Sequence, residues 1–316
     1  MSGTIHPHWG AEALWQHLEP LLPGLSIEVL ARCESTNTVL LERARAQGGA
    51  PDAPITRPGE LESAGASART PLGRRGADVQ PCLLVAEQQT RGRGRLGRDW
   101  VSSASASLTF SLALPLAPGD WSGLSLAVGL ALAEALDPAA QAPDLSLAAA
   151  DSPTPPRIQL KWPNDLWLTD LPSMPGRGRK LGGILIETVS MGPHRMCVVG
   201  VGLNVRPQPV PELPQGYACL QELQPDITAP AALAQVAEPL VRALLDFQAQ
   251  GFAPLVPAYA RRDLLRGQQV TTTMAEVPAG VAEGVDGRGA LRVRSGEVHR
   301  VVSGEVSVRL DHGDPP

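Results

Sequence analysis

The apolar residues of this chain fall into blocks whose spacing separates helices from strands. Apolar residues at the spacing of one helical face, or in a long run, predict helices over 11–22, 38–47, 121–136 and 229–250. Glycines directly follow the second and fourth of these segments, which is the usual helix stop signal. We expect Asp120 to cap the third helix at its amino end.

Shorter apolar blocks predict strands. They cover residues 27–30, 82–86, 108–114, 158–161, 166–168, 181–189 and 196–203. Helices and strands do not alternate regularly along this part of the chain, so a doubly wound parallel sheet does not fit. We therefore predict an α+β fold in which a mixed, mainly antiparallel sheet is backed by helices.

The pattern changes after residue 266. Branched apolar residues there alternate with polar ones, and Asp286-Gly287 and Ser295-Gly296 supply turns between the segments. This alternation predicts a small five-stranded barrel. We therefore divide the chain into a larger domain, 1–266, and a barrel domain, 267–316. The larger domain carries insertions rich in small residues and proline at about 48–80, 137–156 and 171–178.

Composition narrows the function classes. The chain has 316 residues, 43% of them apolar, a net charge of −5 and an isoelectric point near 5.7, which argues against a general polyanion binder. No apolar run reaches membrane-spanning length, and the first ten residues lack the features of a signal peptide. The four cysteines lack the paired spacing of a zinc site or a redox dithiol. We therefore expect a cytoplasmic protein with reduced cysteines.

One segment is strongly basic against this acidic background. Residues 91–98 read Arg-Gly-Arg-Gly-Arg-Leu-Gly-Arg and follow a predicted buried strand. Glycine lets backbone N–H groups turn toward an anion, and arginine binds phosphate or carboxylate with two parallel donors. A solvated linker or an RNA-binding tract would also be rich in Arg and Gly, but a single tract beside a buried strand favours a site loop. We expect this loop to close over an anionic ligand and to exclude water.

Lysine is rare in this chain, and both lysines lie in unusual segments. Lys161 and Lys180 stand against 25 arginines, in Lys161-Trp-Pro-Asn-Asp165 and Lys180-Leu-Gly-Gly-Ile184. An ammonium is a compact point charge that fits between two oxygens where a planar guanidinium does not. At a strand end, Lys161 is well placed to neutralise charge on an attacked phosphate. Asp165 could hold Mg²⁺ or pair with an arginine, and the sequence leaves both alternatives open.

Two further segments bring polar groups next to predicted elements. Ser35-Thr-Asn37 precedes a helix, where such residues usually act as caps, but they could also bind a small polar head group. Gly200-Val-Gly-Leu-Asn204 ends a strand with glycines that let a ligand approach the backbone. Asn204 then offers both a donor and an acceptor.

In their order along the chain, these segments resemble the bacterial biotin protein ligases. The resemblance covers about residues 27–310 apart from the insertions, and it rests on Ser35–Asn37, Gly92–Arg98 with Trp100, Lys161–Asp165, Lys180–Ile184, Gly200–Asn204 and Gly304–Arg309. It implies a fold of the biotin/lipoate ligase type, related to class II aminoacyl-tRNA synthetases, followed by an SH3-like barrel. It also implies a ligase that forms biotinyl-5′-AMP from biotin and ATP with Mg²⁺. The biotin would then pass to a lysine of a biotin carboxyl carrier protein.

The resemblance further implies roles for individual residues. Biotin or its adenylate would contact Ser35, Thr36, Asn37, Gln89, Arg93, Gly94, Arg95, Lys161 and Gly183. The nucleotide would lie toward Arg98, Trp100, Asn204 and Arg309. Lys161 would bridge the biotin carboxylate and the α-phosphate, with Arg95 as the second catalytic residue.

Some expectations concern partners and alternatives. Family members that repress transcription carry an amino-terminal winged helix, and residues 1–26 are too few for one, so we expect no DNA binding. We also expect no membrane partner, while monomer and homodimer are both compatible with the sequence. A regulator that holds biotinyl-5′-AMP without transferring it, and a lipoate ligase of the same fold, are the alternatives; the Arg/Gly loop speaks against the second. Arg91 has no assigned role.

Overall fold

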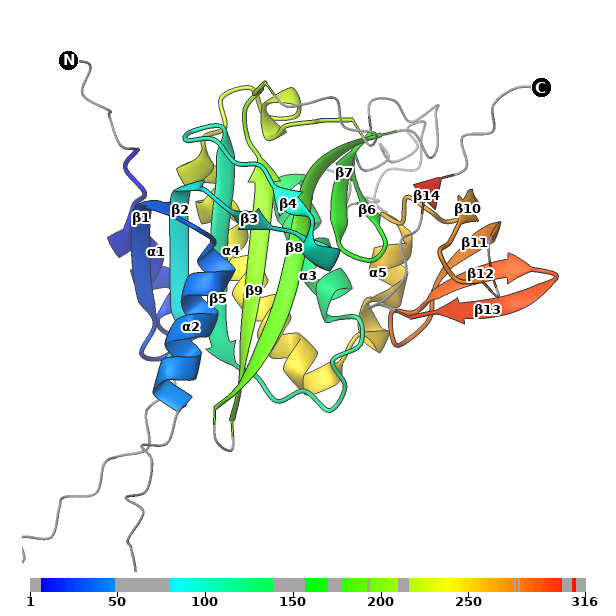
Figure 1. Ribbon diagram of the computed structural model, residues 1–316, viewed down its shortest axis with the longest axis horizontal. Coiled ribbons are helices and arrows are strands. Elements are labelled where there is room, and N and C mark those ends of the chain that lie inside the picture. Colours follow the sequence, from blue (N-terminus) through cyan, green and yellow to red (C-terminus); the bar gives the residue numbers. More distant parts are fainter. Residues whose placement is uncertain are drawn as a thin grey trace, which may run out of the picture.

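The centre of the molecule is a seven-stranded sheet with the order β1-β2-β5-β9-β8-β7-β6 (Figure 1). The computed structural model describes residues 7–48, 80–138, 157–169, 178–191, 194–209, 216–275, 277, 279–302 and 309–310. The strands of this sheet are β1 (Ser26–Cys33), β2 (Cys82–Gln89), β5 (Ser107–Pro115), β6 (Ile158–Lys161), β7 (Asp165–Leu168), β8 (Arg179–Met191) and β9 (His194–Asn204). β1 and β2 pair in parallel, and the other neighbours are antiparallel. The predicted fold class is confirmed.

Helices cover both faces of this sheet. They are α1 (Ala11–Leu18), α2 (Thr36–Gly48), α3 (Leu124–Leu136), α4 (Ala229–Gln250) and the short α5 (Val256–Ala260). On one face, Val199 of β9 belongs to a core that includes Leu132 of α3 and Leu244 of α4. Its neighbour Val198 belongs to a second, smaller core with Leu40 of α2. Successive residues of a strand point to opposite faces, so α2 lies on the face opposite to α3 and α4.

α2 covers only part of its face. Beyond its amino end, a loop built from β3 (Gly92–Arg93), the 3₁₀ turn η1 (Arg95–Gly97) and β4 (Asp99–Trp100) lies across the sheet (Figure 1). Leu96 and Gly97 turn this loop with left-handed backbone angles, φ 56° and φ 71°. A loop in this place, rather than a helix, leaves room for a cavity over the sheet.

The carboxyl-terminal residues form a five-stranded antiparallel sheet with the order β13-β12-β11-β10-β14. Its strands are β10 (Gln269–Thr271), β11 (Ala279–Val285), β12 (Leu291–Ser295), β13 (Glu297–Val301) and β14 (Arg309–Leu310). The predicted alternation holds, since Leu291, Val293 and Val301 are fully buried. The indole Nε1 of Trp162 donates a hydrogen bond to the carbonyl oxygen of Gly289, 3.0 Å away, and so joins this sheet to the β6–β7 turn.

The start of α3 differs from the prediction. The helix begins at Leu124, with Gly123 at its cap position, and Asp120 lies outside it. The Asp120 carboxylate accepts hydrogen bonds from the backbone N–H of Ser122, at 2.9 Å, and from Nε of Arg288, at 2.8 Å. Because both oxygens are used in a turn and a salt bridge, Asp120 does not cap α3. The first helix is also shorter than predicted, since it ends at Leu18.

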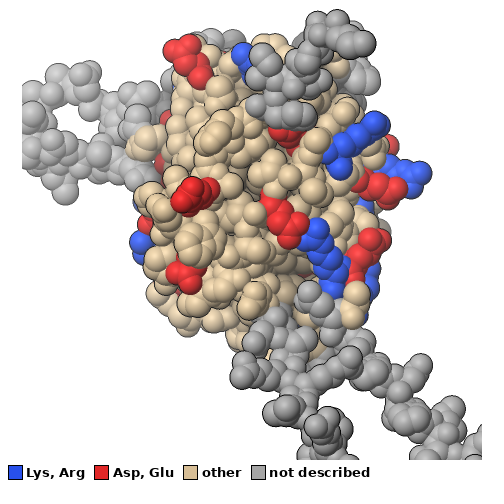
Figure 2. All heavy atoms as spheres, turned by 90° about the vertical axis from the view of Figure 1, so that its left-hand side faces the viewer, with Lys and Arg blue, Asp and Glu red and all other residues tan. Residues whose placement is uncertain are grey.

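The predicted insertions lie almost entirely outside the described residues. None of the described helices combines the length and the apolar character needed to cross a membrane. Seen from the β1 edge of the sheet, the described surface is mostly uncharged, and its basic and acidic side chains are interspersed (Figure 2).

Candidate active site

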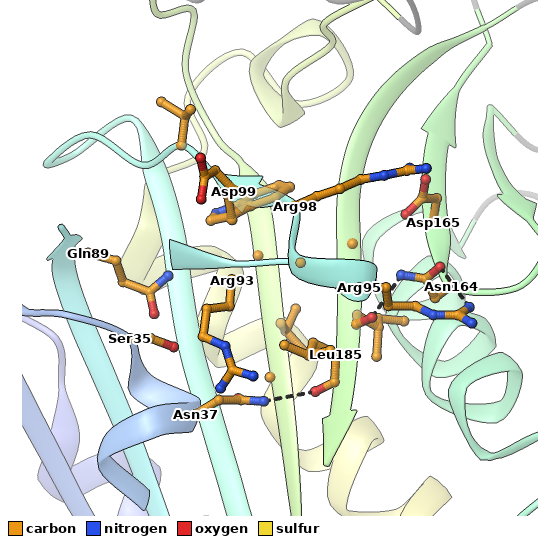
Figure 3. Close-up of a pocket in the computed structure, with 18 of the residues that line it drawn as sticks. Ser35, Asn37, Gln89, Arg93, Arg95, Arg98, Asp99, Asn164, Asp165 and Leu185 are labelled. Atoms are coloured by element: carbon orange, nitrogen blue, oxygen red, sulfur yellow. Dashed lines mark hydrogen bonds between the residues drawn. The ribbon is translucent and has the colours of Figure 1, made fainter. Parts of the chain in front are cut away.

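Most of the predicted site residues gather around one cavity of about 220 Å³ (Figure 3). We call this cavity the chamber; it lies between the amino end of α2, the β3–η1–β4 loop and the strands of the large sheet. The predicted residues that line it are Ser35, Thr36, Asn37, Gln89, Arg93, Gly94, Arg95, Arg98, Trp100, Asp165, Gly183 and Asn204. Segments far apart in the sequence are thus brought to one place.

At one end of the chamber, which we call the head end, neutral hydrogen-bonding groups hold one another in place. The first turn of α2 is tied to β2, because the Thr36 N–H donates to Oε1 of Gln89 at 2.7 Å. The hydroxyl of Ser111 lies 2.6 Å from Oγ1 of Thr36 and from Oδ1 of Asn37. Thr36, Asn37 and Ser111 are nearly fully buried and preorganised, which suits a small planar polar group such as an amide or a urea.

The glycines of β9 make room for side chains on the chamber wall. A Cβ atom at Gly200 would lie 2.2 Å from Oδ1 of Asn37, and one at Gly202 would lie 2.4 Å from Cε2 of Trp100. From the sequence, these glycines are expected to let a ligand approach the backbone. In the structure, Asn37 and the Trp100 ring occupy this space and themselves line the chamber.

The arginine loop is attached at two points, to β8 and to the turn between β6 and β7. Arg93 points toward Asn37 and pairs with Glu187, with Nη2 and Oε1 2.9 Å apart (Figure 3). Arg95 points the other way and donates to Oδ1 of Asn164 at 3.3 Å. Burial lowers the pKa of the Arg95 guanidinium below its ordinary value, although the Asp165 carboxylate partly offsets this effect. A cation that is partly stripped of water interacts more strongly with an incoming anion.

The lysine in the chamber is Lys180. Its Nζ atom lies 2.9 Å from Oδ1 of Asp165, and both side chains line the chamber. Lys161, which the resemblance assigns to the biotin carboxylate, does not line the chamber; its Nζ lies 4.4 Å from the centre of the Trp167 ring. The reason is topological: Lys161 stands on β6, the edge strand, whereas Lys180 stands on β8, two strands closer to the arginine loop. The fold therefore brings Lys180 to the chamber and leaves Lys161 outside its lining, while the predicted catalytic role of Lys161 stays a prediction.

The end of the chamber opposite to the head end, which we call the far end, carries Trp100, Asn204 and Tyr217. The indole Nε1 of Trp100 is buried and has no hydrogen-bond partner in the described part of the chain. The side-chain Nδ2 of Asn204 donates to the backbone carbonyl oxygens of Lys180 and Ala218, at 3.2 and 2.9 Å. The side-chain Oδ1 of Asn204 is thus left for a ligand. The buried Trp100 N–H lies close to Gly202 of β9, so the far end offers one acceptor beside an aromatic ring.

Two predictions about site residues lie partly outside this geometry. Arg309 belongs to β14, but its side chain lies outside what the structure describes, so its predicted role is untested. Asp165 was left open between binding Mg²⁺ and pairing with an arginine; it pairs with a lysine instead. In the described part of the chain, no three His, Cys, Asp or Glu side chains come together as a metal site.

Besides Tyr217, three residues that support this site were not predicted from the sequence. Ser111 supports the head end, Glu187 pairs with Arg93, and Asn164 accepts from Arg95. Signals existed for each: Ser111 interrupts an apolar strand, Glu187 ends the Lys180–Glu187 segment, and Asn164 lies inside the Lys161–Asp165 motif.

Comparison with known proteins points to one family. Residues 79–204 match the biotin/lipoate A/B protein ligase family, and residues 266–309 match the biotin protein ligase C-terminal domain. The chain is 31% identical to the bifunctional ligase/repressor BirA of Escherichia coli, over 91% of this chain and 75% of that protein. It is 32% identical to the biotin–[acetyl-CoA-carboxylase] ligase of Mycobacterium tuberculosis, over 74% of this chain and 81% of that protein.

A solved structure supports the same fold. The biotin protein ligase of Aquifex aeolicus in complex with biotin and ATP matches with a TM-score of 0.62 and 24% sequence identity, over 91% of this chain and 99% of that chain.

Proposed function

The chain belongs to the biotin protein ligase family, and we propose that it attaches biotin to a lysine of a carrier protein in two steps. In the first step, a carboxylate oxygen of biotin attacks the α-phosphorus of ATP, the bond to the β-phosphate breaks, and pyrophosphate leaves. The product is biotinyl-5′-AMP. In the second step, the ε-amine of the carrier lysine attacks the acyl carbon and loses a proton, and AMP leaves with the electron pair of the broken C–O bond.

The head end supports binding of the ureido ring of biotin. A urea offers two N–H donors and one carbonyl acceptor, all in a plane. Asn37 presents its Oδ1 at the chamber wall, while Gln89 has its Oε1 tied to Thr36 and its amide nitrogen left to donate. We propose that Ser35, Thr36, Asn37, Gln89, Arg93 and Gly94 form the biotin end of the site.

The cations in the middle of the chamber support the chemical step. Their position is the observation that carries the proposal. Two anions must meet there, and Lys180 and Arg95 bring two cations to one carboxylate, Asp165. Cations already in place stabilise the charge that develops on the attacked phosphate, without reorganisation during the reaction. Gly183 leaves the space beside Lys180 open, since a Cβ atom there would lie 3.6 Å from Nζ. We propose Lys180 and Arg95 as the catalytic pair.

The far end supports binding of the nucleotide. A flat base can lie against the Trp100 ring, while the side-chain oxygen of Asn204 supplies an acceptor. We propose that Arg98 lies along the phosphates, and Arg309 is proposed for the same end from the resemblance alone. The arginine loop between the two ends would shield the adenylate from hydrolysis.

The remaining proposals concern the metal, the partner and the domains. Mg²⁺ would enter mainly on the triphosphate, whose charge it neutralises, because Asp165 is the only predicted ligand and already holds Lys180. The acceptor is a biotin carboxyl carrier domain of a biotin-dependent carboxylase.

We propose a cytoplasmic location, which the four free cysteines support. We also propose the boundary at 266/267 between catalytic and barrel domains.

The test is a transfer assay. The protein is incubated with ATP, Mg²⁺, biotin and a purified carrier domain, and the product is probed with streptavidin. A biotinylated carrier and released pyrophosphate are expected, and a parallel reaction with lipoic acid should give no product. Adenylate formation without transfer would favour the regulator instead, and transfer of lipoate alone would overturn the proposal.

A further inference from the structure

One carboxylate connects the head end of the chamber with the arginine loop. Glu187 of β8 accepts from Nδ2 of Asn37 at 3.0 Å through Oε2, and from Nη2 of Arg93 at 2.9 Å through Oε1. Its side chain is 24% exposed, so the pair with Arg93 is half-buried. Asn37 and Arg93 come from segments far apart in the sequence, and Glu187 bonds to both.

The bond to Asn37 decides which way its amide faces. Both hydrogens of Nδ2 are used, one by the carbonyl oxygen of Leu185 at 3.1 Å and one by Glu187. Oδ1 therefore faces Ser111 and Gly200 of β9, where it can only accept a hydrogen bond, and Asn37 lines the chamber. A ligand group that binds this oxygen must present an N–H, as a ureido ring does and a dithiolane ring does not.

The bond to Arg93 holds the amino-terminal half of the loop. The Arg93 guanidinium also donates to Oγ1 of Thr38, at 3.4 Å, and Figure 3 shows it lying just above Asn37. The other half of the loop is held separately, by Arg95 and Asn164. Loss of Glu187 would thus free the Arg93 side chain from β8 and loosen this half of the loop, although the Arg91 N–H still donates to the carbonyl oxygen of Glu34 at 2.9 Å.

We propose that Glu187 is a positioning residue for biotin, which acts through Asn37 and Arg93 and does not touch the nucleotide. The proposal deepens the proposed function and rests on it. Glu187 keeps the acceptor oxygen of Asn37 directed at the ring and keeps the first arm of the loop docked beside it. A merely stabilising ion pair of this exposure contributes little and would not distinguish one substrate from the other.

The test compares Glu187→Gln with a matched control, Glu28→Gln. Glu28 pairs with Arg43 at 2.8 Å on the surface, and neither residue lines the chamber. In Glu187→Gln, KM for biotin in pyrophosphate release is expected to rise about tenfold, because a charge-assisted hydrogen bond contributes about 1.5 kcal/mol. KM for ATP should change by less than about twofold, and Glu28→Gln should leave both constants unchanged.

Two further readouts separate the role of Glu187 from general damage. Limited proteolysis of the ligand-free proteins should cut residues 91–98 faster in Glu187→Gln than in the wild type or in Glu28→Gln. The loss of biotin affinity should also be measured in Arg93→Gln, in Glu187→Gln and in the double variant. The fold-loss in the double variant should be smaller than the two single fold-losses multiplied together, since the two residues act as a unit. If Glu187→Gln has a lowered unfolding midpoint, Glu187→Asp is measured in its place, because it keeps the charge and shortens the side chain.

The outcomes are distinct. If the wild type forms no biotinyl-5′-AMP, the proposed function is wrong, and proteolysis alone then decides whether Glu187 holds the loop. If the wild type is active and Glu187→Gln has an unchanged KM for biotin, the inference is overturned. An equal rise in KM for biotin and for ATP would also overturn it, because it would indicate a general disturbance of the chamber.

Discussion

The ammonium of Lys180 lies 2.9 Å from the carboxylate of Asp165, on the neighbouring strand of the central sheet. Both side chains are about one-fifth exposed, at 21% and 23%, so neither is free to move far into solvent. Asp165 thereby holds the only lysine that lines the chamber in the described part of the chain. A pair of this kind keeps a flexible side chain pointed at the place where two anions meet.

Lys180→Ala is therefore expected to lower the rate of pyrophosphate release about a hundredfold or more, the usual cost of losing one preorganised donor at a developing charge. Lys180→Arg should be nearly as damaging, because a planar guanidinium does not replace a point charge. The measurement is pyrophosphate release with saturating biotin and ATP.

Lys161→Met is the matched comparison. This variant keeps a long apolar side chain against Trp167 and removes the charge. It should lower the rate by less than about tenfold, since Lys161 stands two strands away from Lys180. Loss of adenylate formation in Lys161→Met, with Lys180→Ala unaffected, would restore the assignment made from the sequence.

The two glycines of β9 should separate the two substrates. Gly200→Ala places a methyl group against Asn37, and Gly202→Ala places one against Trp100. Each methyl group should displace its neighbouring side chain, and a displacement of this size changes kinetic constants by about tenfold to a hundredfold. Gly200→Ala should therefore raise KM for biotin, and Gly202→Ala should raise KM for ATP. Gly119→Ala, which meets nothing within 4 Å, is the control. Equal effects of the two variants on both substrates would contradict this assignment.

The buried pair of Asp137 and Arg262 should be important for stability. Their atoms Oδ2 and Nη1 lie 3.1 Å apart, and the side chains are 9% and 3% exposed. Oδ2 of Asp137 also accepts from the backbone N–H groups of Arg157 and Ile158. Asp137→Ala leaves a buried guanidinium without its counter-ion, which costs about 3–5 kcal/mol of the free energy of unfolding.

Urea denaturation measures this cost, with Asp226→Ala at an exposed position as the control. The control should change the free energy of unfolding by less than about 0.5 kcal/mol. A similar small loss in Asp137→Ala would mean that solvent reaches the guanidinium.

Asp263 should make stability depend on pH. Burial raises the pKa of its carboxyl to about 6, from an ordinary value of 3.8. The folded protein then binds this proton more tightly than the unfolded chain does. The contribution of this group to the free energy of unfolding therefore falls as pH rises from about 4 to about 6, and it is constant above that window.

Asp263→Asn removes the ionisable carboxyl and with it the loss of stability that its ionisation causes. At pH 7 the variant should be more stable than the wild type by about 1–3 kcal/mol, and the gain should vanish toward pH 4. Thermal or urea unfolding at both pH values checks the prediction. A variant that is less stable than the wild type at pH 7 would show that the ionised carboxylate has a stabilising partner.

The sequence predicted the fold well where local signals agree with the final packing. The glycine after α4 and the alternation in β11–β13 placed those elements close to their observed bounds. The start of α3 was missed because the partner of Asp120 is Arg288, far along the chain. A local capping signal cannot reveal a competing partner that only the fold brings near.

The candidate site, too, was predictable where local signals suffice and not where partners come from distant segments. Residue types and motif order brought most of the chamber together, but they could not decide between two lysines at strand ends. That choice depends on the order of strands in the sheet, which places β8 nearer the loop than β6. Glu187 and Ser111 were invisible for the same reason, because their importance lies in partners from distant segments.

The hydrogen bond from the Trp162 indole to Gly289 has a consequence for any shortened version of this protein. This donor helps to anchor the tip that presents Asn164 and Asp165, so a deletion of the last strands would loosen one wall of the chamber. The carboxyl-terminal sheet thus acts as a buttress.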